Sequence, residues 1–206
     1  MSIQINYKNN SLKNPSANLV LFTDEKFNIS NLKKYISSSE FFYINDLLKT
    51  SDLKKNLLVF EVSSKKKIFL VSIKNSLETS DIENLGAEFY GRVNHDKKSE
   101  YFVNSDTISN KYKNFIGYFL HGLKLKSYEF NLYKSKKEKK LISINVLGKK
   151  NKATIQNELR FKAIEKGTFF ARDLVSEPPN VLNPKEYVNR LLKLRKLGIK
   201  VTVYNE

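Results

Sequence analysis

Two histidines, His95 and His121, are the residues that could act as catalytic bases or metal ligands through an imidazole ring. Zinc sites usually bring histidines together in patterns such as His-Glu-x-x-His, and neither histidine lies in such a pattern. His95 stands beside Asp96 in a lysine-rich stretch, which favours a solvated loop. His121 stands on an otherwise apolar stretch, so we expect it to pack in a partly buried position. Neither histidine is predicted to form a site.

Acidic pairs could hold a hard cation or act as general acid and base. Three occur in the sequence: Asp24 with Glu25, Asp81 with Glu83, and Asp173 with Glu177. We favour a turn, a capped helix start and an exposed helix end, respectively, because the first turn of a helix favours acidic residues. The sequence has no cysteine and no GxGxxG or Walker pattern, which removes thiol chemistry and a nucleotide cradle. We therefore predict no catalytic, cofactor-binding or metal-binding residue in this chain.

The charge balance raises the question of a polyanionic partner. The chain of 206 residues has 37 basic and 21 acidic residues, a net charge of +16, but few of the basic residues are arginine. Arginine makes the bidentate contacts typical of nucleic-acid readers. The block Lys134–Lys140 follows Tyr128, Phe130 and Tyr133 and could grip a single strand, although a solvated lysine loop explains it as well. A freestanding basic module that binds nucleic acid stays open as an alternative.

Membrane and export signals are not evident in the sequence. Residues 1–12 are polar, and no apolar run approaches the ~20 residues needed to cross a bilayer. The lack of cysteine also fits a reducing compartment. We expect a cytoplasmic protein with no membrane partner.

Strand-like and helix-like stretches alternate in the first half and predict an α/β domain. Asn18–Thr23 has the continuous apolar character of a buried strand. Leu57–Ser63 and Ile68–Ile73 flank a lysine-rich tip and predict a hairpin. Leu141–Leu147 predicts a further strand.

Two helices are predicted between these strands. The first opens at Ser80, which we expect to form a capping box with Glu83, and Gly86 and Gly91 would allow a close approach of another backbone. Its apolar face consists of Ile82, Leu85, Phe89 and Val93. The second helix is predicted over Asn110–Leu123.

A long connector helix is predicted from Lys152 to Val175. It must end before Pro178 and Pro179, because proline cannot continue a helix and disfavours helical geometry in the residue before it. A long helix that stops at two prolines is typical of a linker between domains.

The sequence after this break predicts a helix followed by a strand. Asn183 serves as the cap, Pro184 as the first helical residue and Glu186 as the partner in a capping box. The buried face would consist of Val188, Leu191, Leu192 and Leu197. Gly198 would end the helix, and Ile199–Tyr204 alternates as a strand. This strand either adds to the first sheet or begins a second, truncated α/β domain, and the linker favours the second alternative.

Two segments resemble one known family. Ala171–Pro184 resembles the Ala-Arg-Asp-Leu-Val-Asn-Glu-Pro-Pro-Asn-Val-Leu-Thr-Pro segment of the leucyl aminopeptidase (cytosol aminopeptidase) family, with Ser176 replacing the usual Asn. Leu125–Lys136 resembles the Ser-Tyr-x-Phe-Asp-x-Tyr-Lys stretch of the same family, with Asn131 replacing the usual Asp. Both lie in the order that the family has.

The resemblance implies three parts in the chain. A macro-domain-like domain with a mixed sheet flanked by helices would occupy residues 1–150, a linker helix residues 151–177, and the start of a truncated catalytic domain residues 178–206. In the family, that catalytic domain holds two divalent metals, Zn or Mn, which activate the attacking water. The family signature Asn-Thr-Asp-Ala-Glu-Gly-Arg is absent from this chain, so no catalytic or metal residue is carried over.

We therefore expect the N-terminal, non-catalytic portion of a leucyl-aminopeptidase-like metallopeptidase. The full-length parent would remove N-terminal amino acids from peptides and form a homo-hexamer. This chain would serve assembly and access to the active site, with the catalytic domain of the same enzyme as its partner, and would meet the peptide substrate only through that domain. Alone, it is expected to be inactive.

Overall fold

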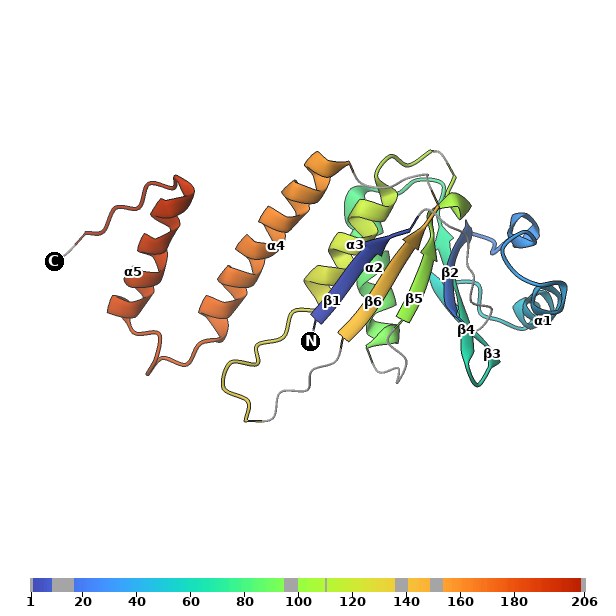
Figure 1. The fold of residues 1–206 in the computed structure, drawn as a ribbon, viewed down its shortest axis with the longest axis horizontal. Helices are drawn as coiled ribbons and strands as arrows, with labels where there is room; N and C mark the ends of the chain where they lie inside the picture. The colour runs from blue at the N-terminus through green and yellow to red at the C-terminus, as the bar shows by residue number, and fades with distance from the viewer. Residues whose placement is uncertain are drawn as a thin grey trace. The chain divides into compact units, whose positions relative to one another are not determined.

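The computed structural model describes residues 2–8, 17–94, 100–109, 111–135, 141–148 and 154–204 (Figure 1). The contacts within the chain divide it into two units, Met1–Ala163 and Ile164–Glu206. His95 and Asp96 lie outside the described residues, as does the part of the basic block from residue 136 to residue 140. The division at residues 150 and 177 stays a prediction.

A mixed sheet of six strands forms the centre of the first unit, as far as the chain is described (Figure 1). Its order is β1-β6-β5-β2-β4-β3, with all neighbours parallel except β3, which is antiparallel to β4. The strands are β1 (Ser2–Tyr7), β2 (Asn18–Asp24), β3 (Leu57–Ser63), β4 (Lys66–Ile73), β5 (Glu100–Asn104) and β6 (Leu141–Leu147). The predicted α/β fold, the hairpin and the strands of β2 and β6 are confirmed.

Helices cover both faces of this sheet. The central strand β2 is therefore buried along almost its whole length. Leu19 and Leu21 belong to one core, together with Ile44 of α1 (Ser38–Leu48). Val20 and Phe22 point into the other core with α2 (Thr79–Val93) and α3 (Phe115–Lys126). A short 3-10 helix, η1 (Ser30–Leu32), joins β2 to α1.

Helices α2 and α3 approach so closely that backbone atoms touch. A Cβ built on Gly86 would lie 1.8 Å from the carbonyl oxygen of Phe119, and one on Gly122 would lie 1.9 Å from that of Glu83. The close approach predicted at Gly86 is confirmed. The prediction for Gly91 is wrong, because this residue faces open space.

The starts of α2 and α3 differ from those predicted. Helix α2 is capped by Glu78, and the Oδ2 atom of Asp81 accepts a hydrogen bond from the Glu78 N–H at 2.9 Å. The capping box predicted between Ser80 and Glu83 is therefore wrong. Glu78 and Asp81, each two residues earlier, form the box instead. Helix α3 begins at Phe115 rather than near residue 110, because Asn114 adopts a left-handed conformation with φ 57° that α-helix cannot continue through.

Helix α1 is held to the sheet by a partly buried ion pair. The Lys66 Nζ lies 2.6 Å from the Glu40 Oε1, and both side chains are 13% exposed. Burial alone would raise the pKa of Glu40, but hydrogen bonds from Lys66 and from the Ser37 backbone outweigh it and lower this pKa. The pair fixes the helix that follows the β2 loop.

The second unit contains the end of α4 (Ile155–Ser176), then α5 (Pro184–Leu192) and the 3-10 helix η3 (Lys193–Leu197). Gly198 ends η3 with φ 81°, as predicted. The predicted buried face of α5 is wrong, because this helix has no buried residue and Leu197 is 75% exposed. Residues Ile199–Tyr204 are not paired as a strand within the described part of the chain, and the helix–strand unit that would begin a second α/β domain stays a prediction.

None of the helices in the described part of the chain is both long enough and apolar enough to cross a membrane.

The close contact of α2 with α3 predicts opposite effects for two alanine substitutions. Gly86→Ala forces a methyl group onto the Phe119 carbonyl and should lower the free energy of unfolding by about 3 kcal/mol or more. Gly91→Ala meets no atom and should raise it by about 0.5–1 kcal/mol. Urea denaturation of both variants measures this, and equal midpoints would contradict the close contact.

The Glu40–Lys66 pair predicts a pH dependence of stability. Because the folded-state pKa of Glu40 is lowered, its contribution is present above the unfolded value near 4.5 and is lost as the pH falls through the folded pKa. Glu40→Gln should therefore reduce the loss of stability measured by urea denaturation between about pH 5 and pH 3. Glu61→Gln, at a side chain that is 71% exposed, is the control and should leave this loss unchanged.

Candidate functional site

A crevice opens at the point where β2 and β5 separate. These parallel neighbours pair only over Asn18–Val20 and Tyr101–Val103. Further along, the Phe22 N–H donates to the Thr107 Oγ1 at 3.0 Å, so a side chain replaces the neighbouring strand as acceptor. After β2 the chain goes to the α1 side of the sheet, and after β5 to the α3 side. Open α/β sheets commonly bind ligands at such a reversal.

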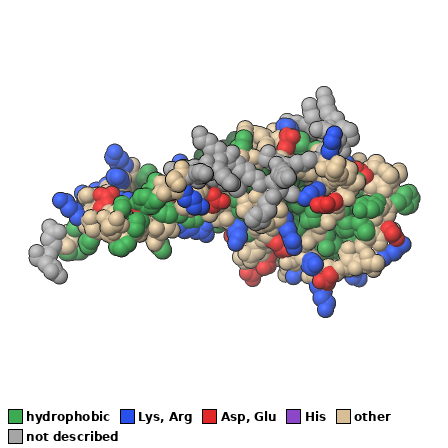
Figure 2. Space-filling view, turned by 90° about the horizontal axis from the view of Figure 1, so that it is seen from below, with side chains coloured by type: hydrophobic (Ala, Val, Ile, Leu, Met, Phe, Trp, Pro, Cys, Tyr) green, Lys and Arg blue, Asp and Glu red, His purple; other side chains and the backbone are tan. Residues whose placement is uncertain are grey.

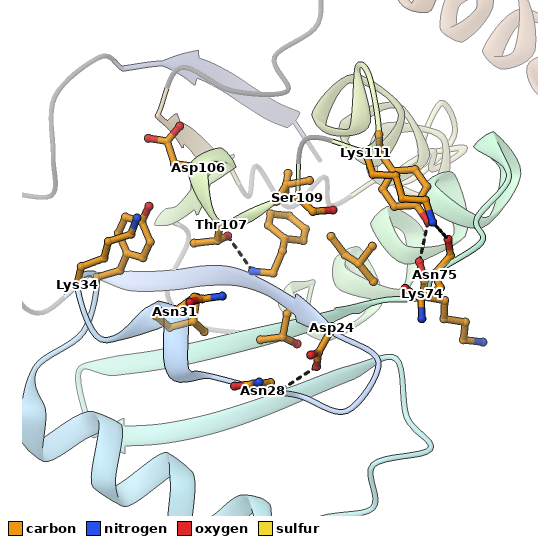
Figure 3. A pocket seen from close by; sticks show the side chains of 17 residues that line it. Asp24, Asn28, Asn31, Lys34, Lys74, Asn75, Asp106, Thr107, Ser109 and Lys111 are labelled. Carbon is orange, nitrogen blue, oxygen red and sulfur yellow. Dashed lines mark hydrogen bonds between the residues drawn. The ribbon is translucent and has the colours of Figure 1, made fainter.

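The crevice encloses a cavity of about 430 Å³ at the carboxyl ends of β2, β4 and β5 (Figure 3). Its walls come from the segments 22–24, 28–35, 73–75, 106–109 and 111–112. The polar side chains of these walls belong to Thr23, Asp24, Asn28, Asn31, Lys34, Tyr35, Lys74, Asn75, Asp106, Thr107, Ser109, Lys111 and Tyr112. This polar lining contains carboxylates, amines, amides and hydroxyls, but neither imidazole nor thiol.

The loop after β2 is held by Asp24. Its Oδ1 atom accepts hydrogen bonds from the backbone N–H groups of Lys26 at 3.1 Å and Asn28 at 2.8 Å. Such a side-chain turn accommodates the left-handed conformation of Phe27, whose φ is 53°. Glu25 accepts a hydrogen bond from the Asn75 side chain at 3.1 Å instead of joining Asp24 around a cation. The turn predicted for this acidic pair is confirmed.

The loops after β4 and β5 are tied to each other. The Tyr112 hydroxyl donates to the Lys74 carbonyl at 2.7 Å, and the Lys111 amine donates to the Asn75 carbonyl (Figure 3). Thr107, which accepts from Phe22, donates its own hydroxyl proton to the Asn104 carbonyl at 2.8 Å. The walls of the cavity are therefore fixed by hydrogen bonds between loops that are far apart in the sequence.

His121 lies outside this lining and has a packing role. It is 3% exposed, its ring stacks on Phe161 with centroids 4.8 Å apart, and its Nε2 lies 3.9 Å from the Glu83 Oε1. The predicted packing role is confirmed, and Asp81 of the second acidic pair accepts the hydrogen bond from the Glu78 N–H at the start of α2, as described above. Over the described residues, no three His, Asp or Glu side chains converge as metal ligands.

A second feature is the joint between α4 and α5, within the second unit. After α4 ends at Ser176, the Pro178 carbonyl accepts hydrogen bonds from Val181 at 3.0 Å and Leu182 at 2.9 Å. The Asn183 side chain then accepts from the Glu186 N–H at 3.0 Å and caps α5. The predicted helix end and the predicted cap are confirmed.

Arg190 locks this joint through two carboxylates. Its guanidinium donates to the Glu177 Oε1 at 2.8 Å and to the Glu186 Oε1 at 3.1 Å, and it lowers the pKa of Glu186. Because Glu186 makes this contact, the reciprocal half of the predicted capping box does not form. The Glu177 side chain is 2% exposed, so the prediction of an exposed helix end is wrong for this residue.

No family model matches the chain. A probable cytosol aminopeptidase of Agrobacterium fabrum is 36% identical over 94 residues, which cover 43% of this chain and 19% of that protein. Another, of Rhizobium rhizogenes, is 30% identical over 138 residues, which cover 63% of this chain and 28% of that protein. Part of this chain is therefore similar in sequence to part of these two cytosol aminopeptidases. It spans well under a third of the length of these relatives.

Solved structures of the family share its fold. A tomato leucine aminopeptidase mutant superposes with a TM-score of 0.69 and 18% identity, covering 95% of this chain and 42% of that one. The cytosol aminopeptidase from Coxiella burnetii superposes with a TM-score of 0.59 and 14% identity, covering 93% and 37%. At these identities the likeness establishes the fold alone.

The sequence alone predicted the turn between α4 and α5, but it did not predict the crevice between β2 and β5. The local signal was present, because short polar clusters follow the apolar runs of β2 and β4. It could not be used without β5, whose five residues were not predicted as a strand.

The crevice predicts a specific role for the Thr107 hydroxyl. Thr107→Val leaves the Phe22 N–H without its acceptor in a buried position and should lower the free energy of unfolding by about 1–3 kcal/mol. Thr107→Ser keeps the hydroxyl and should retain most of the stability. The urea midpoints of both variants measure the difference. An equal loss of stability in the two variants would show that the Thr107 hydroxyl does not stabilise the fold.

Proposed function

We propose that this chain is the N-terminal, non-catalytic portion of a leucyl-aminopeptidase-like metallopeptidase. The parent would remove N-terminal amino acids from peptides, and this portion would serve assembly and access to the active site. The observation that carries the proposal is homology over 138 residues, which are 63% of this chain but 28% of the relative. Most of the relative therefore lies outside the matched part. The names of these cytosolic relatives also support a cytoplasmic location.

The two metals of the parent are assigned to residues outside this chain. The described residues do not fit a metal pair, because no group of three candidate ligands comes together among them. A bottromycin maturation enzyme solved in complex with Mn shares the fold with a TM-score of 0.61 and 11% identity, so it supports the fold but no ligand of this chain.

The joint supplies a physical basis for the assembly role. Arg190 pairs with the buried Glu177 across the Pro178–Pro179 break and fixes the direction in which α5 leaves α4. Such a lock would set the path of the chain into a catalytic domain. The catalytic domain, the peptide that it binds and a homo-hexamer of the parent are the partners we propose.

No comparison and no contact among the described residues supports the nucleic-acid alternative. Figure 2 shows one face of the molecule, on which Lys and Arg side chains are interspersed with acidic, apolar and other side chains. Nucleic-acid surfaces gather cations along a stripe or patch. We therefore propose no second function.

The isolated chain should not release leucine from leucine p-nitroanilide. The assay is made with Mn²⁺ and with Zn²⁺, and the intact Agrobacterium fabrum relative serves as the positive control. Metal-dependent hydrolysis by this chain, abolished by EDTA, would overturn the assignment of catalysis to residues outside it.

A chimera tests the assembly role. This chain replaces the matched N-terminal part of the Agrobacterium fabrum relative, and the chimera should keep metal-dependent activity. Arg190→Ala in the chimera should lower both the activity and the assembled fraction, because it removes the guanidinium that donates to the Glu177 Oε1 across the proline break. Lys196→Ala, at an exposed residue, is the control. Size-exclusion chromatography and hydrolysis rates are measured, and an unaffected Arg190 variant would remove the proposed role of the joint.

A further inference from the structure

We propose that the β2–β5 crevice binds a small zwitterion, namely a free α-amino acid or a short peptide. The relatives' names say nothing of this crevice, and the proposal does not depend on the function proposed above. It follows from the charges, the fixed geometry and the apolar floor of the cavity.

Charges of both signs line the cavity. Figure 3 shows Lys34 and Asp106 on one side, Lys74 and Lys111 on the other, and Asp24 on the wall between them. A ligand with a single charge would find like charges within the same small volume, which is unfavourable. A ligand that carries both an ammonium and a carboxylate group can pair each of its charges with an opposite one. The lining therefore matches a zwitterion better than an anion or a cation.

Two of the charged residues, Asp106 and Lys111, are held in position before any ligand arrives. The Asp106 N–H donates to the Asn104 Oδ1 at 3.0 Å, and the Asp106 carboxylate lies against Gly148. A Cβ at Gly148 would be 2.6 Å from the Asp106 Cγ, so only glycine leaves room for the carboxylate there. On the other side, the Lys111 amine is bonded to the Asn75 carbonyl. Ordering these side chains in advance lowers the entropy lost on binding.

Apolar side chains form the floor of the cavity. Phe22, Leu32, Ile73 and Ile108 line it and are buried, and Tyr112 is half-buried. A volume of about 430 Å³ lies within the range of ligand pockets, ~300–1,000 Å³. An apolar side chain can rest on this floor while the charged groups of the ligand meet the polar walls. Leucine is therefore a suitable probe.

Binding of leucine and three relatives to the full chain tests the proposal by isothermal titration calorimetry. Leucine or the dipeptide Leu-Gly should bind saturably with a Kd below about 1 mM, and their ratio distinguishes the amino acid from the peptide. Leucinamide lacks the carboxylate and N-acetylleucine lacks the ammonium, so both should bind at least about tenfold more weakly. If N-acetylleucine binds as well as leucine, the crevice is an anion site and the proposal is wrong. If neither leucine nor Leu-Gly binds, the proposal is also wrong.

Two substitutions locate the binding in the crevice. Asp106→Asn and Lys111→Gln each remove one charge from the lining and should weaken leucine binding at least about tenfold. Lys113→Gln changes an exposed lysine outside the lining and should leave the affinity unchanged. Circular dichroism tests whether each variant is folded. If a variant does not fold, the binding of leucine and its analogues to the unaltered chain still tests the proposal. Equal affinities of all three variants would place the binding elsewhere and overturn the proposal.

Discussion

The architecture of the first unit depends on the hydrogen bonding of β2. This strand pairs with β4 from Leu19 to Asp24, but with β5 only over its first three residues. The continuous pairing on one side holds the hairpin of β3 and β4 to the sheet centre, and the interrupted pairing on the other leaves the crevice. Because both faces of β2 are buried, helices on both sides are required, and the loops that lead to them become the walls of the cavity.

The parts of the fold that sequence could predict are those with a local cause. The strand β2 contains a continuous apolar run, β6 is rich in Ile, Val and Leu, and the stop at Pro178 follows from the covalent structure of proline. Other parts depend on remote residues. The polar β1 is a strand because β6 pairs with it, and Ile199–Tyr204 alternates correctly but has no such partner in the described structure. Alternation predicts which way side chains point, whereas pairing decides whether a strand forms.

The same distinction applies to the candidate site. Spacing correctly assigned His121 to packing and Asp24 to a turn, because both roles involve near neighbours or an apolar helix face. It misjudged Glu177, whose partner Arg190 lies beyond the proline break, and it could not find the crevice, which three separate loops create. Residues that meet only through topology leave no pattern in the spacing of the chain.

The contact between α2 and α3 also limits how the first unit can move. Helices that pack through layers of side chains can slide over each other by small rotamer changes, which is the basis of shear motion. Gly86 and Gly122 leave no such layer, because each faces a carbonyl group of the other helix directly. The two helices should therefore move as one body. A shear of α2 over α3 therefore cannot widen the crevice, and widening it would require breaking the hydrogen bonds that join its loops.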